Sequence, residues 1–251
     1  TGVMAFEMSA FYKDIRDLLS LQSIRYDSEK YGPSNYSIYM NKDYGNVKGF
    51  TFSLTKRYDR VTKTSAFVDY TYQVTEGNSV KSGSFYYNAL SGEEEEKRIV
   101  PLSWDQRHIL NSTVSVGDPG NWNLGLISKL SSGWPYTPNI PDANYVPLSN
   151  SGRKPWQWRI DMRLHKNFKV GKFQYIVYTK IYNLLDRRNE RYVFNDTGRA
   201  GYTYVSQSTQ ETKGFVDHYG ESGVHTWSEY QVRPQYYTAP RSINIGFSLD
   251  F

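Results

Sequence analysis

Two polar segments of this sequence contain side chains that could bind a metal ion. His218, Glu221 and His225 lie close together in the chain, and imidazole and carboxylate groups bind several transition metals. The run Glu93 to Glu96 could attract a hard cation such as Ca²⁺, or the cations that accompany lipopolysaccharide. The His-Glu-His spacing is not that of a helical metal-binding pair, and solvated loops explain both segments more simply. We therefore expect neither a metal nor another cofactor.

A third set of polar side chains alternates along one segment, at Arg159, Asp161, Arg163 and His165. Such a set could belong to a transport path or to a catalytic cluster. Four ionisable side chains on one face of a strand are too many for a dry core, and a charge network facing a wet lumen is the interpretation we favour. Ser, His and Asp also occur, but no nucleophile elbow or comparable signature brings them together. The sequence predicts no enzyme.

Aromatic side chains in or beside the long polar segments are the best candidates for ligand binding. Rings of this kind could form platforms for a siderophore, a sugar or a peptide, although packing within the loops or at a membrane interface would explain them equally well. The candidate residues are Trp134, Tyr136, Tyr145, Tyr192, Tyr202 and Tyr204.

The elements that position these residues are β-strands. In residues 241–251, apolar side chains alternate strictly with polar ones, and the apolar positions are Ile243, Ile245, Phe247, Leu249 and Phe251. This period of two predicts a strand with one apolar and one polar face. The same alternation occurs in residues 49–54, 65–74 and 155–168, with Phe67 as an exception. Less regular strands are expected at 3–14, 104–116, 121–134 and 172–183, where Ile127, Ile176 and Tyr178 interrupt the pattern.

About eight strands result, and the connections between them alternate in length. Short connections fall at 59–63, 117–120 and 170–171, and long ones at 17–44, 76–102, 135–154 and 185–239; residues 14–21 could form a short helical turn. Outer-membrane barrels have short periplasmic turns and long extracellular loops, whereas soluble sandwiches have no reason to place every long loop at one end. The predicted fold is all-β, a transmembrane antiparallel up-and-down β-barrel.

Composition supports a membrane location. Only 38% of the 251 residues are hydrophobic, yet 16% are aromatic, and rings with a polar tip suit a surface that meets both lipid and water. The positive charges are scattered, which argues against nucleic acid, and no apolar run approaches the roughly 18 residues of a membrane-spanning helix. Aromatic residues near the expected strand ends are typical of interface girdles: Trp104, Trp122, Trp134, Tyr136, Trp156 and Trp158.

Several segments, in this order and spacing, resemble the C-terminal part of the barrel of TonB-dependent outer-membrane receptors. They are residues 11–18 (FYKDIRDL), 44–52 (YGNVKGFTF), 104–108 (WDQRH), 159–164 (RIDMRL), 181–186 (IYNLLD), and Pro240-Arg241 leading to the terminal Phe251. The resemblance extends along nearly the whole chain.

The resemblance implies that residues 1–251 form the last eight strands of a 22-stranded barrel, with the plug domain absent from this chain. An eight-stranded barrel closed by this chain alone is the alternative. The implied partners are outer-membrane lipid and lipopolysaccharide, the remaining barrel and plug, the inner-membrane TonB complex acting through that plug, and the barrel-assembly machinery, for which Phe251 would be the signal. The implied location is the bacterial outer membrane.

Energised uptake of a nutrient is therefore the predicted function, with this chain supplying barrel wall and loops. Two other classes remain open. A structural or adhesive barrel would bind a partner through its long loops without membrane energy. An outer-membrane hydrolase would depend on residues such as Asp161 or His165.

Overall fold

The fold is a single large antiparallel sheet with a small two-stranded sheet beside it. The computed structural model describes residues 4–30, 32–78, 98–118, 120–139, 147–205, 229 and 231–250. The long strands are β1 (Met4–Ser28), β2 (Gly32–Asp59), β3 (Thr64–Gly77), β5 (His108–Asp118), β6 (Trp122–Ser131), β9 (Gln157–Val170), β10 (Phe173–Tyr182) and β11 (Ser242–Asp250). The short ones are β4 (Val100–Pro101), which extends the pairing of β3, and the pair β7 (Pro135–Tyr136) and β8 (Gly152–Arg153).

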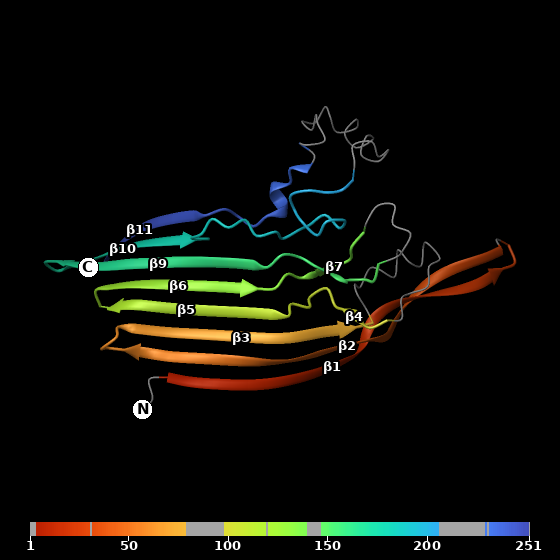
Figure 1. Ribbon diagram of the computed structural model, residues 1–251, viewed down its shortest axis with the longest axis horizontal. Coiled ribbons are helices and arrows are strands. Elements are labelled where there is room, and N and C mark those ends of the chain that lie inside the picture. Colours follow the sequence, from red (N-terminus) through yellow and green to blue (C-terminus); the bar gives the residue numbers. More distant parts are fainter. Residues whose placement is uncertain are drawn as a thin grey trace.

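The eight long strands lie side by side in the order in which the chain makes them. Every neighbouring pair, from β1–β2 to β10–β11, is antiparallel. The prediction of an all-β, up-and-down wall of about eight strands is thus confirmed. Within the described residues β1 pairs only with β2, and β11 only with β10, so the sheet is open (Figure 1).

Connections of contrasting length lie at opposite ends of this sheet. Residues 60–63, 119–121 and 171–172 join strands at the end near both labelled termini, which we call the turn end (Figure 1). The connections from β3 to β5, from β6 to β9 and from β10 to β11 leave and rejoin the sheet at the other end, the loop end. The predicted alternation of connections is therefore present from β2 onward, whereas β1 and β2 are joined by a short connection where a long one was predicted.

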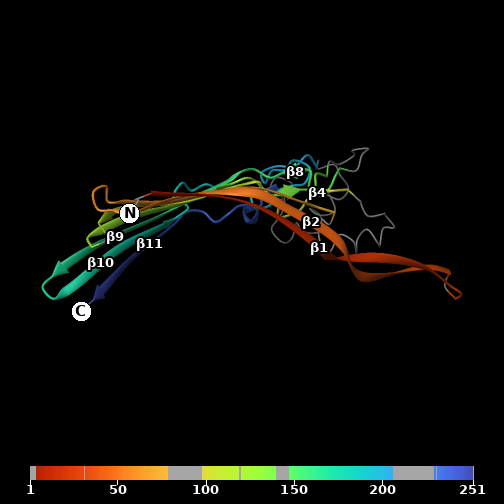
Figure 2. The ribbon, with the colours of Figure 1, turned by 90° about the horizontal axis from the view of Figure 1, so that it is seen from below.

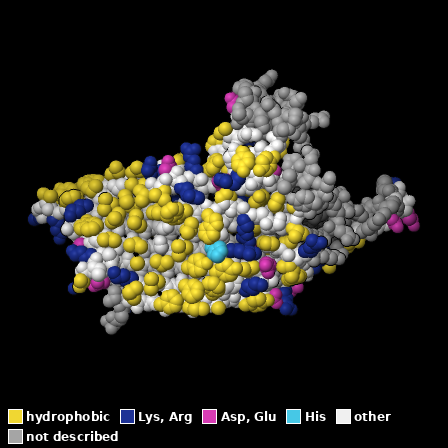
Figure 3. All heavy atoms as spheres, in the orientation of Figure 1, with side chains coloured by type: hydrophobic (Ala, Val, Ile, Leu, Met, Phe, Trp, Pro, Cys, Tyr) yellow, Lys and Arg dark blue, Asp and Glu magenta, His cyan; other side chains and the backbone are white. Residues whose placement is uncertain are grey.

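One face of the sheet is apolar across its whole width. The strand registers align Phe52 with Tyr70, Val114 with Leu126, and Val177 with Phe247 on the same side. Apolar side chains cover the face turned toward the viewer in Figure 3. Many of these side chains are largely exposed: Phe6 is 67%, Ile245 76% and Phe247 62% exposed. Soluble proteins rarely expose so large a contiguous apolar surface. Such a face needs lipid as its solvent.

The opposite face is polar and internally hydrogen-bonded. Ser53 donates to Asp69 at 2.8 Å, and Ser115 donates to Asn123 at 2.9 Å. Phe67, Ile127, Ile176 and Tyr178, which interrupt the sequence alternation, lie on this face by register. The ring of Tyr178 has room because residue 246 is glycine: a Cβ there would lie 2.1 Å from Tyr178 Cζ.

The first two strands differ from the prediction. The sequence predicts a loop at residues 17–44 and allows a helical turn at 14–21, but both segments belong to a continuous β1–β2 hairpin that projects beyond the other strands (Figures 1 and 2). The register shifts between Ile15 and Leu19, where Asp17 has a φ of 58°, and the hairpin changes direction there (Figure 2). The bulge explains the error, because the chain bends without leaving the ladder.

Buried side chains are few in the described part of the chain and gather at the loop end. Among the described residues the buried apolar side chains are Val100, Leu102, Val193 and Ala200, none of them on the long strands. A wall with lipid on one side has no interior of its own, so the packed core of the described part forms where the loops fold together. No helix in the described residues is long and apolar enough to span a membrane.

Candidate functional site

The four ionisable side chains predicted on one face of β9, Arg159, Asp161, Arg163 and His165, lie on the polar face. Arg159 Nε donates to Asp161 Oδ1 at 2.8 Å, and the backbone N–H of Asn183 donates to the same oxygen at 2.8 Å. His165 is four residues from Asp161, about 13 Å along a strand at ~3.3 Å per residue, and the register sets it opposite Asn123 and Tyr178. Asp161 and His165 therefore do not form an acid–base pair.

Two asparagine side chains anchor the segment after β10, one to the start of β9 at the loop end and the other to the chain that returns before β11. Asn189 accepts a hydrogen bond from Trp158 N at 2.9 Å and donates one to Trp158 O at 2.9 Å. Asn183, 5% exposed and with a φ of 54°, donates to the carbonyls of Arg187 and Ala239, both at 3.1 Å. The motif at 181–186 thus begins a loop whose start and return are joined by one side chain.

A buried carboxylate joins two other loop segments. Asp105 is fully buried, and its Oδ1 accepts the backbone N–H of Thr75 at 2.8 Å. Its Oδ2 forms ion pairs with Arg107, at 3.3 Å, and with Arg153, whose Nη1 also donates to Asp105 O at 2.6 Å. Arg153 belongs to β8, so this cluster holds the segment 132–156 against the end of β3.

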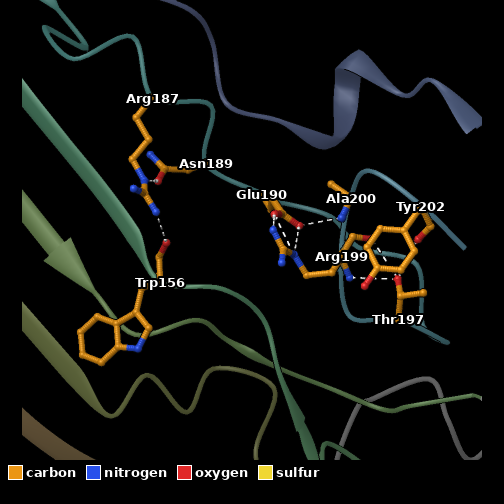
Figure 4. A network of polar contacts seen from close by, with 8 residues as sticks. All are labelled: Trp156, Arg187, Asn189, Glu190, Thr197, Arg199, Ala200 and Tyr202. Carbon is orange, nitrogen blue, oxygen red and sulfur yellow. Dashed lines mark hydrogen bonds and ion pairs between the residues drawn. The ribbon is translucent and has the colours of Figure 1, made fainter.

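Residues 190–204 form a compact loop around two acidic side chains. Arg199 pairs with Glu190, with Nη2 to Oε1 at 2.7 Å, and Glu190 Oε2 also accepts the backbone N–H of Ala200 at 2.6 Å (Figure 4). This pairing raises the pKa of the Arg199 guanidinium. Asp196 accepts hydrogen bonds from Thr197 N at 2.9 Å and from the Thr203 hydroxyl at 2.5 Å. The carboxylates of this loop are therefore engaged within the loop itself.

The structure brings part of the predicted aromatic set together. Tyr136 packs on Gly198, where a Cβ would lie 2.3 Å from its hydroxyl, and burial, followed by the charge of Asp196, raises the pKa of Tyr136. Thr197 donates to Tyr202 O at 2.8 Å, and the rings of Tyr202 and Tyr204 meet edge to face at 6.0 Å. These three tyrosines thus belong to one loop assembly.

Two further members of the set are connected through Lys154. The backbone N–H of Lys154 donates to Trp134 O at 3.0 Å, and Lys154 Nζ lies 5.9 Å from the centroid of the Tyr192 ring. Burial lowers the pKa of Lys154. Trp134 is 37% and Tyr192 49% exposed, so both rings have accessible faces. Tyr145 lies outside the described residues.

Several residues that organise this region were missed by sequence reasoning. In the sequence Asp105 stands out only as part of the WDQRH segment, and nothing local indicates that Arg153, 48 residues away, contacts it. Lys154, Arg191 and Tyr236 carried no signal beyond a basic or aromatic side chain in a long loop. The candidate metal ligands His218, Glu221, His225 and Glu93 to Glu96 all lie outside the described residues, and in the described part no cluster of three or more His, Asp or Glu side chains could hold a metal ion.

Comparison with known proteins adds information about the fold. No protein-family model matches the sequence, and no curated protein sequence matches it. Among solved structures, the outer membrane transporter YddB from Escherichia coli aligns with a TM-score of 0.56 and 13% sequence identity, over 76% of this chain and 28% of that one. The chain has the fold of an outer-membrane barrel wall. At this identity the likeness shows the fold alone.

The likeness agrees with the division of the sheet into an apolar and a polar face. The predicted location in the bacterial outer membrane is consistent with both findings, because a lipid-facing band of strands is the surface that such a barrel presents. The match spans little more than a quarter of the length of YddB.

Proposed function

We propose that this chain forms part of the barrel and loops of a TonB-dependent outer-membrane transporter that takes up a nutrient. The observation that carries the proposal is the combination of a lipid-facing apolar side with a polar, charged side and firmly anchored loops. A barrel wall with a purely structural role in the membrane would need no charged side chains on its inner surface. An inner surface bearing Arg159, Asp161, Arg163 and His165 suits a wet lumen that is lined or plugged by polar protein.

The open sheet supports a larger barrel over an eight-stranded one. The edges β1 and β11 lie at opposite sides of the sheet and do not pair with each other in the described residues. We infer that further strands complete the wall, that a plug domain fills it, and that this chain corresponds to the C-terminal segment of a 22-stranded receptor barrel. The inner-membrane TonB complex would act on that plug, while the barrel-assembly machinery would recognise the strand ending at Phe251, a residue outside the described part.

A comparison of nutrient depletion by three strains tests this function. The wild-type strain, a strain without this receptor and a strain without the TonB complex would grow in the same medium, and the compounds left in the medium would be measured by mass spectrometry. We expect the receptor deletion to leave behind a subset of the compounds left by the TonB deletion. Depletion of those compounds by the TonB-deficient strain would refute energised uptake.

An adhesive barrel is the second candidate, and the β1–β2 hairpin is the observation in its favour. Tyr26 and Tyr36 meet edge to face at 5.6 Å near its tip, and Tyr39 is 67% exposed. Exposed aromatic side chains of this kind are typical of protein contacts. If the strain without this receptor loses surface attachment but depletes nutrients normally, that result would favour this alternative.

A further inference from the structure

We propose that a surface at the loop end, made of Lys154, Arg191, Tyr192, Phe194, Arg233 and Tyr236, binds a ring-shaped ligand that carries carboxylate or sulfate groups. We call this surface the cation–ring patch. The inference rests on the proposed function in that it names the chemistry of the ligand, but it concerns binding and not energised transport.

The patch combines cations with aromatic rings. Lys154 Nζ lies 5.9 Å and Arg191 Cζ 5.5 Å from the centroid of the Tyr192 ring. The Tyr236 ring lies 5.9 Å from that of Tyr192 and 5.3 Å from that of Phe194. Arg233 Cζ lies 5.3 Å from the centroids of both Phe194 and Tyr236. Three cations and three rings thus form one continuous surface.

Backbone contacts fix the geometry of the patch. Arg191 N and Tyr192 N both donate to Tyr236 O, at 2.7 and 3.1 Å, and Lys154 Nζ donates to Arg191 O at 3.1 Å. These contacts join three segments that are distant in the sequence. The rings are therefore held in place before any ligand arrives, which lowers the entropic cost of binding.

The charges of Lys154 and Arg191 are not neutralised by carboxylates in the part of the chain that the structure describes. Residues 183–205 contain four arginines and three carboxylates. Asp186 accepts Arg241 N, Glu190 pairs with Arg199, and Asp196 is held by Thr197 and Thr203. Neither Lys154 nor Arg191 forms an ion pair with a carboxylate among the residues that the structure describes.

Charge and shape together define the ligand. An exposed aromatic face stacks on the flat apolar side of a ring, and a guanidinium and an ammonium beside it form charge-assisted hydrogen bonds to carboxylate or sulfate oxygens. A neutral sugar would use only the rings, and an isolated inorganic anion would use only the cations. A ligand with both features, such as an acidic saccharide, uses the whole patch.

The test uses calorimetry on the full-length receptor in detergent, with tetragalacturonate and its methyl-esterified counterpart as probes. The two probes share their rings and differ in charge. We expect the acidic probe to bind at least about tenfold more tightly, since each charge-assisted contact typically changes affinity by tenfold or more, and to weaken as salt is added. Equal affinity for the two probes would overturn the proposal.

Variants locate the binding surface. The double substitution Lys154→Gln with Arg191→Gln should weaken tetragalacturonate binding at least about tenfold. Of the two single variants at position 154, Lys154→Arg, which keeps the charge, should bind the probe more tightly than Lys154→Gln. Lys172→Gln, at the turn end, removes a charge far from the patch and should leave binding unchanged. Equal loss in the Lys172 variant would show non-specific attraction and refute the patch.

Two further measurements distinguish a soluble ligand from membrane headgroups, and binding from transport. The first measures binding of vesicles that contain lipopolysaccharide. If the receptor binds these vesicles tightly, the double variant does not, and soluble tetragalacturonate does not bind, the patch recognises membrane headgroups and the proposal of a soluble ligand is overturned. Binding of tetragalacturonate does not require the TonB complex. Failure of the unaltered receptor to bind tetragalacturonate therefore contradicts this inference alone, whereas TonB-independent uptake contradicts the proposed function alone.

Discussion

The side-chain amide of Asn189 makes with Trp158 both of the hydrogen bonds that a neighbouring strand would make. Its Oδ1 accepts Trp158 N and its Nδ2 donates to Trp158 O, each at 2.9 Å. One side chain thus terminates the ladder at the loop end of β9 and secures the long connection that follows β10.

Replacing this amide should release the loop without damaging the wall. Asn189→Ala leaves both backbone groups of Trp158 without their partner, a cost of about 1–3 kcal/mol for the docked loop. We expect faster tryptic cleavage after Arg187, Arg188 and Arg191, measured on intact receptor in detergent. Asn195→Ala is the control, because among the described residues Asn195 contributes only its backbone carbonyl, which accepts Asn139 N at 2.9 Å. Unchanged cleavage of the Asn189 variant would contradict this role.

Asp105 should matter more than an ion pair on the surface. Asp105→Asn removes the charge that faces Arg153 and Arg107, whose side chains are 30% and 37% exposed, so solvent screening reduces the loss to about 1–3 kcal/mol. Asp118→Asn, which breaks an exposed pair with Lys63 at 3.6 Å, should cost at most about 1 kcal/mol. Urea unfolding of receptor refolded in lipid compares the two. A larger loss in the Asp118 variant would refute the anchoring role.

Adjacent residues of β6 provide a test of the two faces. Leu126 lies on the apolar face opposite Val114, and Ile127 on the polar face opposite Thr113. Leu126→Arg should destabilise the protein folded in a bilayer by about 2–4 kcal/mol, whereas Ile127→Arg should have a small effect. The fraction folded in lipid vesicles, read from the mobility of unheated samples on a gel, measures both. Equal losses would show that the assignment of faces is wrong.

Burial lowers the pKa of Lys154, and this has a measurable consequence. Acylating reagents attack the neutral amine, so the pH at which labelling of Lys154 is half-maximal should be lower in the folded receptor than in the urea-unfolded chain. Because the unfolded chain binds more protons between the two pKa values, the stability of the loop region should rise with pH across that window. Mass spectrometry of labelled peptides provides the measurement, and an unchanged or higher midpoint would contradict the burial.

Period-two alternation predicted the clearest strands of the wall, and β-branched and aromatic content predicted the others. Residues such as Trp158, Ile160 and Met162 face lipid, Arg159 and Asp161 face the polar side, and nothing between them breaks the register. The pattern carries this information because the bilayer and the lumen impose opposite demands on neighbouring residues. Beyond Asp17 the β1–β2 hairpin projects past the rest of the wall, so its two faces do not meet these opposite demands. The alternation fades there, and the sequence pattern therefore predicts a loop.

The loop end was predictable in composition but not in contacts. Polar and aromatic residues were expected there, yet the pairing of Asp105 with Arg153 and the stacking of Tyr192 on Tyr236 join segments far apart in the chain. Such contacts depend on how the loops pack on one another, and no local periodicity encodes them. The aromatic set Trp134, Tyr136, Tyr192, Tyr202 and Tyr204 remains a prediction as a ligand platform.

The open edges of the sheet constrain how this wall can enter a bilayer. Along β1 and β11 the outward backbone N–H and C=O groups have no partner in the described residues, and each such group left in hydrocarbon costs several kcal/mol. With several of these groups on each edge, the total is of the order of tens of kcal/mol. Both edges of the wall therefore need hydrogen-bonding partners wherever the sheet lies in hydrocarbon, which couples lateral strand pairing to membrane insertion.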